Sequence, residues 1–244
     1  MPLAATAPGA NMDGMTNPPA LWEPAAGVRH RGTLAVIGGR DEGVRVYERF
    51  GRRIAADGYV VGVFETAQLP DALAWLGGQE TAPRVLVGSD AGAAAVLTAL
   101  AERAPVDGAI VAGTPVGADG GEAPAASART ACPVHLGVLG DEGTHAAHGA
   151  ASATLPDGGF LGSVAVPVLA VHGGADPVAP FAAAADYLAA LPSLELVETV
   201  DGLHDALNDL SHRSAAARVV LWLERLRAGD VTAPIVRTAT RVAA

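Results

Sequence analysis

Residues 86–95 read LVGSDAGAAA, and this segment carries the strongest fold signal in the chain. An apolar strand pattern at 84–87 leads into it, and an alanine-rich helical pattern at 91–103 follows. Gly88 and Gly92 each lie two residues from Asp90, whereas Ser89 has no glycine two residues before it. The spacing matches the G-x-nucleophile-x-G turn, in which a sharp strand-to-helix bend presents the central side chain. The sequence therefore predicts a nucleophile elbow whose central residue is aspartate.

Outside this turn, short apolar runs alternate with helical patterns. The predicted strands cover residues 33–37, 59–64, 84–87, 109–112, 168–171 and 194–199. The predicted helices cover residues 46–56, 71–76, 91–103, 181–191 and 212–226, with a weaker one at 143–151. This alternation predicts an α/β fold with a mostly parallel central sheet and helices on both faces.

Bulk composition bounds the organisation of the chain. The 244 residues, half of them hydrophobic, suit one domain at 18–244 that follows a disordered arm at 1–17, with a short lid region at 113–163. The formal net charge of -10 disfavours nucleic acid and anionic membranes as partners. A single cysteine and the lack of a signal peptide or a long apolar run predict a cytoplasmic protein.

Two further strand ends carry polar groups. Asp176 lies in a Gly-Gly-Ala-Asp-Pro turn after the strand at 168–171, and His204 lies in the loop after the strand at 194–199. Functional loops of such sheets gather at the carboxyl ends of the strands. The chain order is elbow, acid and histidine, which is the order of catalytic triads on strand-to-helix elbows. Each residue also has a structural explanation, as a helix cap, a turn aspartate or a loop histidine.

Taken together, these motifs resemble the α/β-hydrolase superfamily, near its small monoglyceride-lipase-like members, over residues 31–227. The resemblance implies a catalytic triad of Asp90, Asp176 and His204. It also implies an oxyanion hole made by the backbone amides of Arg40 and Ala91. Serine, the usual central residue of the elbow, is replaced here by aspartate.

Residues 36–59, VIGGRDEGVRVYERFGRRIAADGY, resemble the loop that follows the third strand in this family. Gly38 stands where the family usually has histidine, and Gly39 is retained. Gly39, Ser89 and His172 are weaker candidates for the wall of a substrate pocket. Arg40 is also a candidate to hold a substrate carboxylate.

No metal and no cofactor is expected. The spacings of Cys132, His135, His145 and His148 are compatible with zinc ligands, but they lie in a Gly/Ala-rich loop region without a second ligand pair. The expected partner is a small organic substrate, and the sequence is compatible with a homodimer.

An aspartate at the elbow leaves several chemistries open. As a nucleophile, Asp90 would attack a carbon that bears a leaving group, as in an epoxide or alkyl halide, and His204 would activate water to release the ester. As a general base, Asp90 would serve epimerisation, cyclisation or another proton transfer of natural-product biosynthesis. A catalytically silent ligand-binding protein and an engineered replacement of serine are further alternatives.

Overall fold

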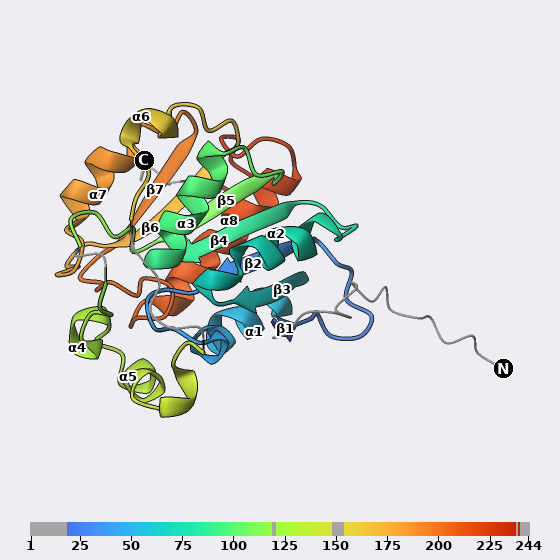
Figure 1. Ribbon diagram of the computed structural model, residues 1–244. Helices are drawn as coiled ribbons and strands as arrows, with labels where there is room; N and C mark the ends of the chain where they lie inside the picture. The colour runs from blue at the N-terminus through green and yellow to red at the C-terminus, as the bar shows by residue number, and fades with distance from the viewer. Residues whose placement is uncertain (1–18, 119–120, 148–153, 238, 240–244) are drawn as a thin grey trace, which may run out of the picture.

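A seven-stranded sheet in the order β1-β3-β2-β4-β5-β6-β7 organises the computed structural model (Figure 1). The structure describes residues 19–118, 121–147, 154–237 and 239, so the predicted arm at 1–17 lies outside the described residues. The strands are β1 (Ala20–Trp22), β2 (Gly32–Ile37), β3 (Tyr59–Phe64), β4 (Arg84–Ser89), β5 (Gly108–Ala112), β6 (Val168–Gly173) and β7 (Leu194–Thr199). The helices are η1 (Val44–Tyr47), α1 (Glu48–Ala56), η2 (Thr66–Gln68), α2 (Leu69–Gly77), α3 (Ala91–Ala101), α4 (Ala126–Arg129), α5 (Pro133–Leu139), η3 (Glu142–Thr144), α6 (Gly158–Leu161), α7 (Phe181–Leu188) and α8 (His212–Arg227).

Strands β2 to β7 pair in parallel, and β1 alone is antiparallel to its neighbour, β3. The strands from β2 to β6 are almost entirely buried, because helices cover both sides of the sheet. The prediction of a mostly parallel α/β sheet is therefore confirmed.

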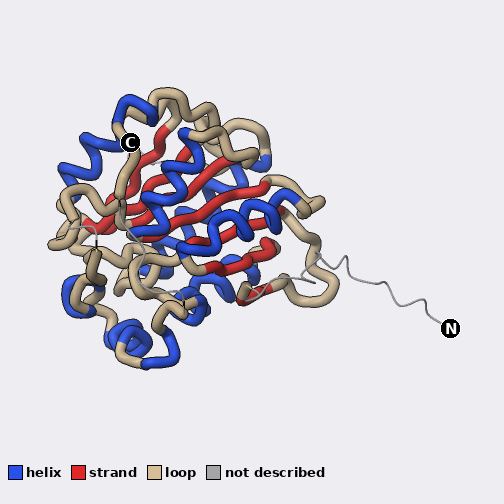
Figure 2. The backbone as a smooth tube through the Cα atoms, viewed as in Figure 1, coloured by secondary structure: helices blue, strands red, loops and turns tan. Residues whose placement is uncertain are grey.

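The core lies in two layers, one on each face of the sheet. On one face, α1 and α8 pack against side chains such as Leu34, Val36 and Val171. On the other face, α2, α3 and α7 pack against side chains such as Ala35 and Ile37. Figure 1 shows α2 and α3 in front of the sheet and α8 behind it, and Figure 2 shows the strands as the middle layer. Successive residues of β2 face opposite layers, as the period of two along a strand requires.

The predicted strands and the five main helices all form, with ends shifted by a few residues. The start of the helix predicted at 46–56 is the short 3-10 turn η1, and Gly58 ends α1 with a φ of +96°. The sequence did not predict β1, a three-residue edge strand whose Trp22 lies against Gly51 of α1. No helix among the described residues has both the length and the apolar character needed to cross a membrane.

The region at 113–163 differs most from its prediction. It contains α4, α5, η3 and α6, of which only η3 overlaps the predicted helix at 143–151. That helix prediction is wrong for residues 145–147, and residues 148–151 lie outside the described part of the chain. The short helices carry too few residues for a clear periodic pattern, and polar contacts to the rest of the protein hold them in place.

Candidate functional site

Asp90 occupies the tip of the turn between β4 and α3, with φ +50° and ψ -119°. Such a backbone conformation is strained for a residue with a side chain. The flanking glycines are needed for close packing: a Cβ on Gly88 would lie 2.2 Å from the Gly92 carbonyl oxygen, and one on Gly92 would lie 2.1 Å from the Ile37 carbonyl oxygen. The turn therefore has the local geometry that the glycine spacing predicts.

His204 lies between the two predicted carboxylates. Its Nε2 is 3.1 Å from Asp90 Oδ1, and its Nδ1 is 2.7 Å from Asp176 Oδ2. The other oxygen of Asp176, Oδ1, accepts hydrogen bonds from the amides of Val178 and Ala179 at the turn after β6. All three side chains of the Asp-His-Asp set are buried. The structure thus brings together the three residues predicted as a triad, from three separate strand ends.

Arg40 clamps the Asp90 carboxylate with both its backbone and its side chain. Its amide donates to Asp90 Oδ2 at 2.9 Å, its Nε donates to the same oxygen at 2.8 Å, and its Nη2 donates to Oδ1 at 2.7 Å. The Arg40 side chain is only 2% exposed. Together with His204, Asp90 therefore receives four hydrogen bonds. The side chain of Arg40 was predicted as a possible ligand for a substrate carboxylate, and in this structure it binds the protein's own carboxylate.

Electrostatics reinforce this arrangement. Burial alone would raise the pKa of Asp90, but hydrogen bonds from His204 and Arg40 hold it well below its usual range. Burial would likewise raise the pKa of Asp176, and hydrogen bonds from His172 and His204 lower it instead. Burial opposes the charged form of His204, yet its hydrogen bonds to Asp176 and Asp90 raise its pKa to about 9. At neutral pH the site thus holds two carboxylates, one guanidinium and one imidazolium, with no net charge.

The remaining predicted site residues surround this cluster. Ala91 directly follows Asp90 as the first residue of α3, so its amide stays a predicted oxyanion donor. The Gly39 amide donates to Glu42 Oε2 at 2.6 Å. Ser89 is buried beside the Tyr47 hydroxyl. His172 Nε2 lies 2.7 Å from the Ala179 carbonyl oxygen and 3.1 Å from Asp176 Oδ2, so it contacts the acid.

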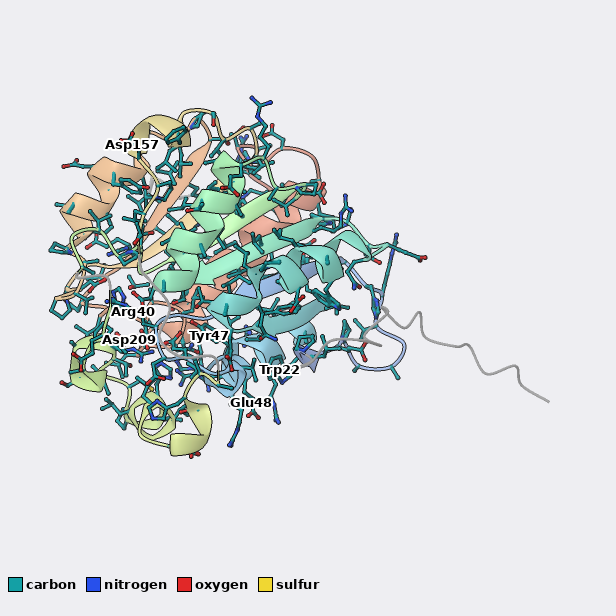
Figure 3. All side chains as sticks on the ribbon, viewed as in Figure 1. Trp22, Arg40, Tyr47, Glu48, Asp157 and Asp209 are labelled. Atoms are coloured by element: carbon teal, nitrogen blue, oxygen red, sulfur yellow. The ribbon has the colours of Figure 1, made fainter. Side chains whose placement is uncertain are left out.

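A second buried ionic cluster lies next to the first, and the sequence did not predict it. Arg129 of α4 donates to Asp205 Oδ1 at 3.2 Å and to Asp205 Oδ2 at 3.0 Å, and it also donates to Glu42. His135 of α5 has its Nε2 2.8 Å from Asp205 Oδ2, and Tyr47 donates to Glu42. These contacts fasten α4 and α5 to the residue that follows His204. Figure 3 shows Arg40, Tyr47 and Asp209 gathered at the end of the molecule where α4 and α5 lie.

The histidines and the cysteine that have zinc-compatible spacing take separate partners. His135 pairs with Asp205, His145 Nδ1 lies 2.6 Å from Asp41 Oδ2, and Cys132 Sγ accepts from Arg49 at 3.4 Å. His148 lies outside the described residues. Among the residues that are described, no three His, Cys, Asp or Glu side chains are grouped so that they could hold a metal ion.

Comparison with known proteins adds evidence on the fold. No protein-family model matches the sequence, and no curated protein matches it. Among solved structures, the chain is similar to a monoacylglycerol lipase from Paleococcus ferrophilus, with 15% identity, coverage of 85% of this chain and 98% of that chain, and a TM-score of 0.68.

Two further structures have the same architecture. A soluble variant of monoglyceride lipase from Saccharomyces cerevisiae, solved in complex with a substrate analog, is 13% identical and covers 84% of this chain and 90% of that chain, with a TM-score of 0.68. The esterase domain of a Rhodothermus marinus protein is 17% identical and covers 84% and 91% of the two chains, with a TM-score of 0.58. Structural similarity at such low sequence identity shows a shared fold and does not show a shared activity. The sheet order, the elbow and these likenesses show that the chain has the α/β-hydrolase fold.

Proposed function

We propose that this chain is a hydrolase for a small organic molecule in which the Asp90 carboxylate is the nucleophile. The observation that carries the proposal is the placement of the two Asp90 oxygens. Oδ2 accepts from the Arg40 amide, where an oxyanion would be stabilised, and Oδ1 lies 3.1 Å from His204 Nε2. A carboxylate in this position needs no base to activate it, because it is already ionised at neutral pH.

The pKa of Asp90 favours a nucleophile over a general base. A general base works best when its pKa lies near the working pH. Asp90, with its pKa held well below the usual range, takes up protons poorly but stays fully ionised. His204, with a pKa of about 9, is also a poor base in the resting protein, because it already carries its proton at neutral pH.

Covalent attack would change that. Asp90 Oδ1 would form a bond to a carbon of the substrate, and the bond from that carbon to its leaving group would break, with the electron pair departing on the leaving group. The resulting ester is neutral, so Asp90 would lose the negative charge and the acceptor of the His204 hydrogen bond that raise the pKa of His204. His204 would then give its proton to the anionic leaving group or to solvent, and it would serve as base for water in the second step, oriented by Asp176.

The Arg40 donors to Oδ2 would act in this second step. Water, deprotonated by His204, would add to the ester carbonyl carbon of Asp90, and the negative charge would develop on the carbonyl oxygen. The amide and the Nε of Arg40 both point at that oxygen in the resting protein. Collapse of the intermediate would break the ester bond. The departing oxygen would leave as an alcohol with one proton of the added water, and the other proton would stay on His204, which restores the resting carboxylate and imidazolium.

A second candidate function, a catalytically silent ligand-binding protein, is favoured by a different observation. The guanidinium of Arg40 covers both oxygens of Asp90, and neither side chain is more than 5% exposed. An incoming substrate must displace Arg40 Nη2 from Oδ1 before attack. A protein in which this ion pair never opens would have no reaction at Asp90.

Intact-mass spectrometry on the His204→Gln protein tests the proposal. The variant is exposed to a panel of epoxides and haloalkanes, because loss of the base should trap the alkyl ester that these compounds would form on Asp90. The expected result is an adduct on the peptide that contains Asp90, absent from the Asp90→Asn/His204→Gln double variant. An adduct that persists in the double variant, or wild-type turnover of a panel member with no adduct in His204→Gln, would argue against a covalent Asp90 step. If no protein forms an adduct and the wild type turns over no member of the panel, the ligand-binding alternative would be favoured.

A further inference from the structure

A cavity of about 320 Å³ lies between α1 and α8, on the face of the sheet that these two helices cover. None of its lining residues belongs to the Asp90 site. The lining residues are Arg49, Phe50, Arg53, Leu207, His212, Arg213 and Ala216. A cavity of this volume is at the lower end of the range for small-molecule sites.

Three arginines and no carboxylate line this cavity. Arg49 donates to neutral acceptors, the Cys132 sulfur and the Asn208 carbonyl oxygen. Arg53 has Asp57 as its acidic neighbour at 3.9 Å, with both side chains largely exposed. Arg213 has no ion-pair partner within the described part of the chain. In a protein of net charge -10, a cavity lined by three arginines, of which Arg53 has a nearby carboxylate in Asp57, favours an anionic ligand.

The start of α8 adds to the positive potential. His212 and Arg213 are the first two residues of this 16-residue helix, and helix N-termini attract anions. His212 Nδ1 lies 3.0 Å from the Asp209 carbonyl oxygen, which orients the ring at the cavity edge. Burial and then the charge of Arg49 lower the pKa of His212, as expected beside cationic groups.

Beneath these charges the cavity has an apolar floor. Phe50, Leu207 and Ala216 are each buried, whereas Arg53 and Arg213 are exposed at the rim. Such a site suits a ligand with an anionic end that faces the arginines and a small apolar end that covers the floor. Each guanidinium can bind two phosphate oxygens at once. Three guanidinium groups also carry more positive charge than a single carboxylate would neutralise, so a dianionic group fits best.

We propose that this cavity binds a phosphate monoester with a small apolar substituent. Arg53 and Arg213 hold the phosphate, Arg49 adds positive charge from the inner wall, and the substituent packs on Phe50 and Leu207. The proposal stands apart from the chemistry at Asp90 and does not depend on it.

Isothermal titration calorimetry with phenyl phosphate, inorganic phosphate and phenol, at constant ionic strength, tests this site. Phenyl phosphate is expected to bind more tightly than inorganic phosphate, and phenol is expected not to bind. Arg213→Gln and Arg53→Gln should each lower the affinity for phenyl phosphate by about tenfold or more, since one charge-assisted hydrogen bond contributes at least that factor to binding. Both side chains are exposed, so both variants should keep the wild-type thermal midpoint.

The matched control is Arg218→Gln, on the same helix but outside the cavity, where the arginine pairs with Glu195 at 2.7 Å. It removes the same charge and should leave the affinity unchanged. Equal weakening by Arg218→Gln and Arg213→Gln would show a general charge effect and overturn the site. No binding of phenyl phosphate at millimolar concentration would also overturn it. Binding of inorganic phosphate as tight as that of phenyl phosphate would overturn the assignment of the apolar floor.

Discussion

Replacing Asp90 with asparagine should destabilise the protein substantially, because Arg40 would lose the partner of its buried charge. The carboxylate accepts four hydrogen bonds of 2.7–3.1 Å, three from Arg40 and one from His204. Asparagine keeps the shape but removes the negative charge and replaces one acceptor oxygen with a donor group. Breaking a buried ion pair from one side costs about 3–5 kcal/mol. Such a loss is a large fraction of the roughly 5–15 kcal/mol that holds a typical protein folded.

Urea denaturation followed by circular dichroism measures this loss, provided that the slope of the free energy of unfolding against urea is unchanged. Arg40→Gln and the double variant complete a cycle, and a coupling of about 2 kcal/mol is expected for groups in direct contact. Asp57→Asn is the control, because Asp57 lies 3.9 Å from Arg53 with both side chains largely exposed. Its expected cost is below about 1 kcal/mol.

A loss of stability in Asp90→Asn no greater than that in Asp57→Asn, or a coupling to Arg40 close to zero, would contradict the buried ion pair. Either outcome would mean that solvent reaches the two side chains and that the pair is open in solution. An open pair would in turn remove the main support for the silent alternative, since nothing would then cover the Asp90 carboxylate.

Three other predictions follow from the same structure. By ¹⁵N NMR, His204 should titrate with a pKa of about 9, and this pKa should fall towards its ordinary value of about 6.5 in Asp90→Asn. Because the pKa of His204 is higher in the folded than in the unfolded protein, the contribution of His204 to stability is complete below about pH 6.5 and is lost as the pH rises towards 9. Arg129→Gln should lower the free energy of unfolding by about 3–5 kcal/mol in urea denaturation and should speed hydrogen exchange in α4 and α5, since two buried carboxylates lose their cation. Unchanged exchange in these helices would contradict the role of Arg129 in fastening them. Gly92→Ala should lower the thermal midpoint strongly, because its Cβ would lie 2.1 Å from the Ile37 carbonyl oxygen. The control is Gly77→Ala, whose Cβ would enter open space and which should be neutral or stabilise the protein by up to about 1 kcal/mol. Similar effects of the two substitutions would contradict the close backbone packing at the elbow.

Much of the sheet was predictable because its signals are local. The strand at 59–64, YVVGVF, has the predicted bounds, since a continuous apolar run that stops at Glu65 leaves little choice, and the strand at 194–199 also has its predicted bounds. The short helices α4, α5 and α6 were not predictable. They have four to seven residues each, and the contacts of Arg129 and His135 with Asp205 span 76 and 70 residues of sequence.

The candidate site divides in the same way. Glycine spacing alone pointed to Asp90, and the order of strand ends pointed to Asp176 and His204. The role of Arg40 was different: its amide was expected as an oxyanion donor, but the return of its side chain to the carboxylate 50 residues later was not expected. No local pattern encodes such a contact, because it depends on how closely the loop after β2 approaches the elbow.

The α/β alternation, the elbow with aspartate at its centre, and the two carboxylates that meet at His204 could all be predicted from the sequence. These features follow from hydrophobic periodicity and from glycines whose missing side chains permit close backbone packing. Folding alone brings the Arg40 side chain over Asp90, places a second ionic cluster beside α4 and α5, and puts three arginines in one cavity between α1 and α8. Those arrangements join residues far apart in the chain, and the energy of a buried charge depends on neighbours that only folding supplies.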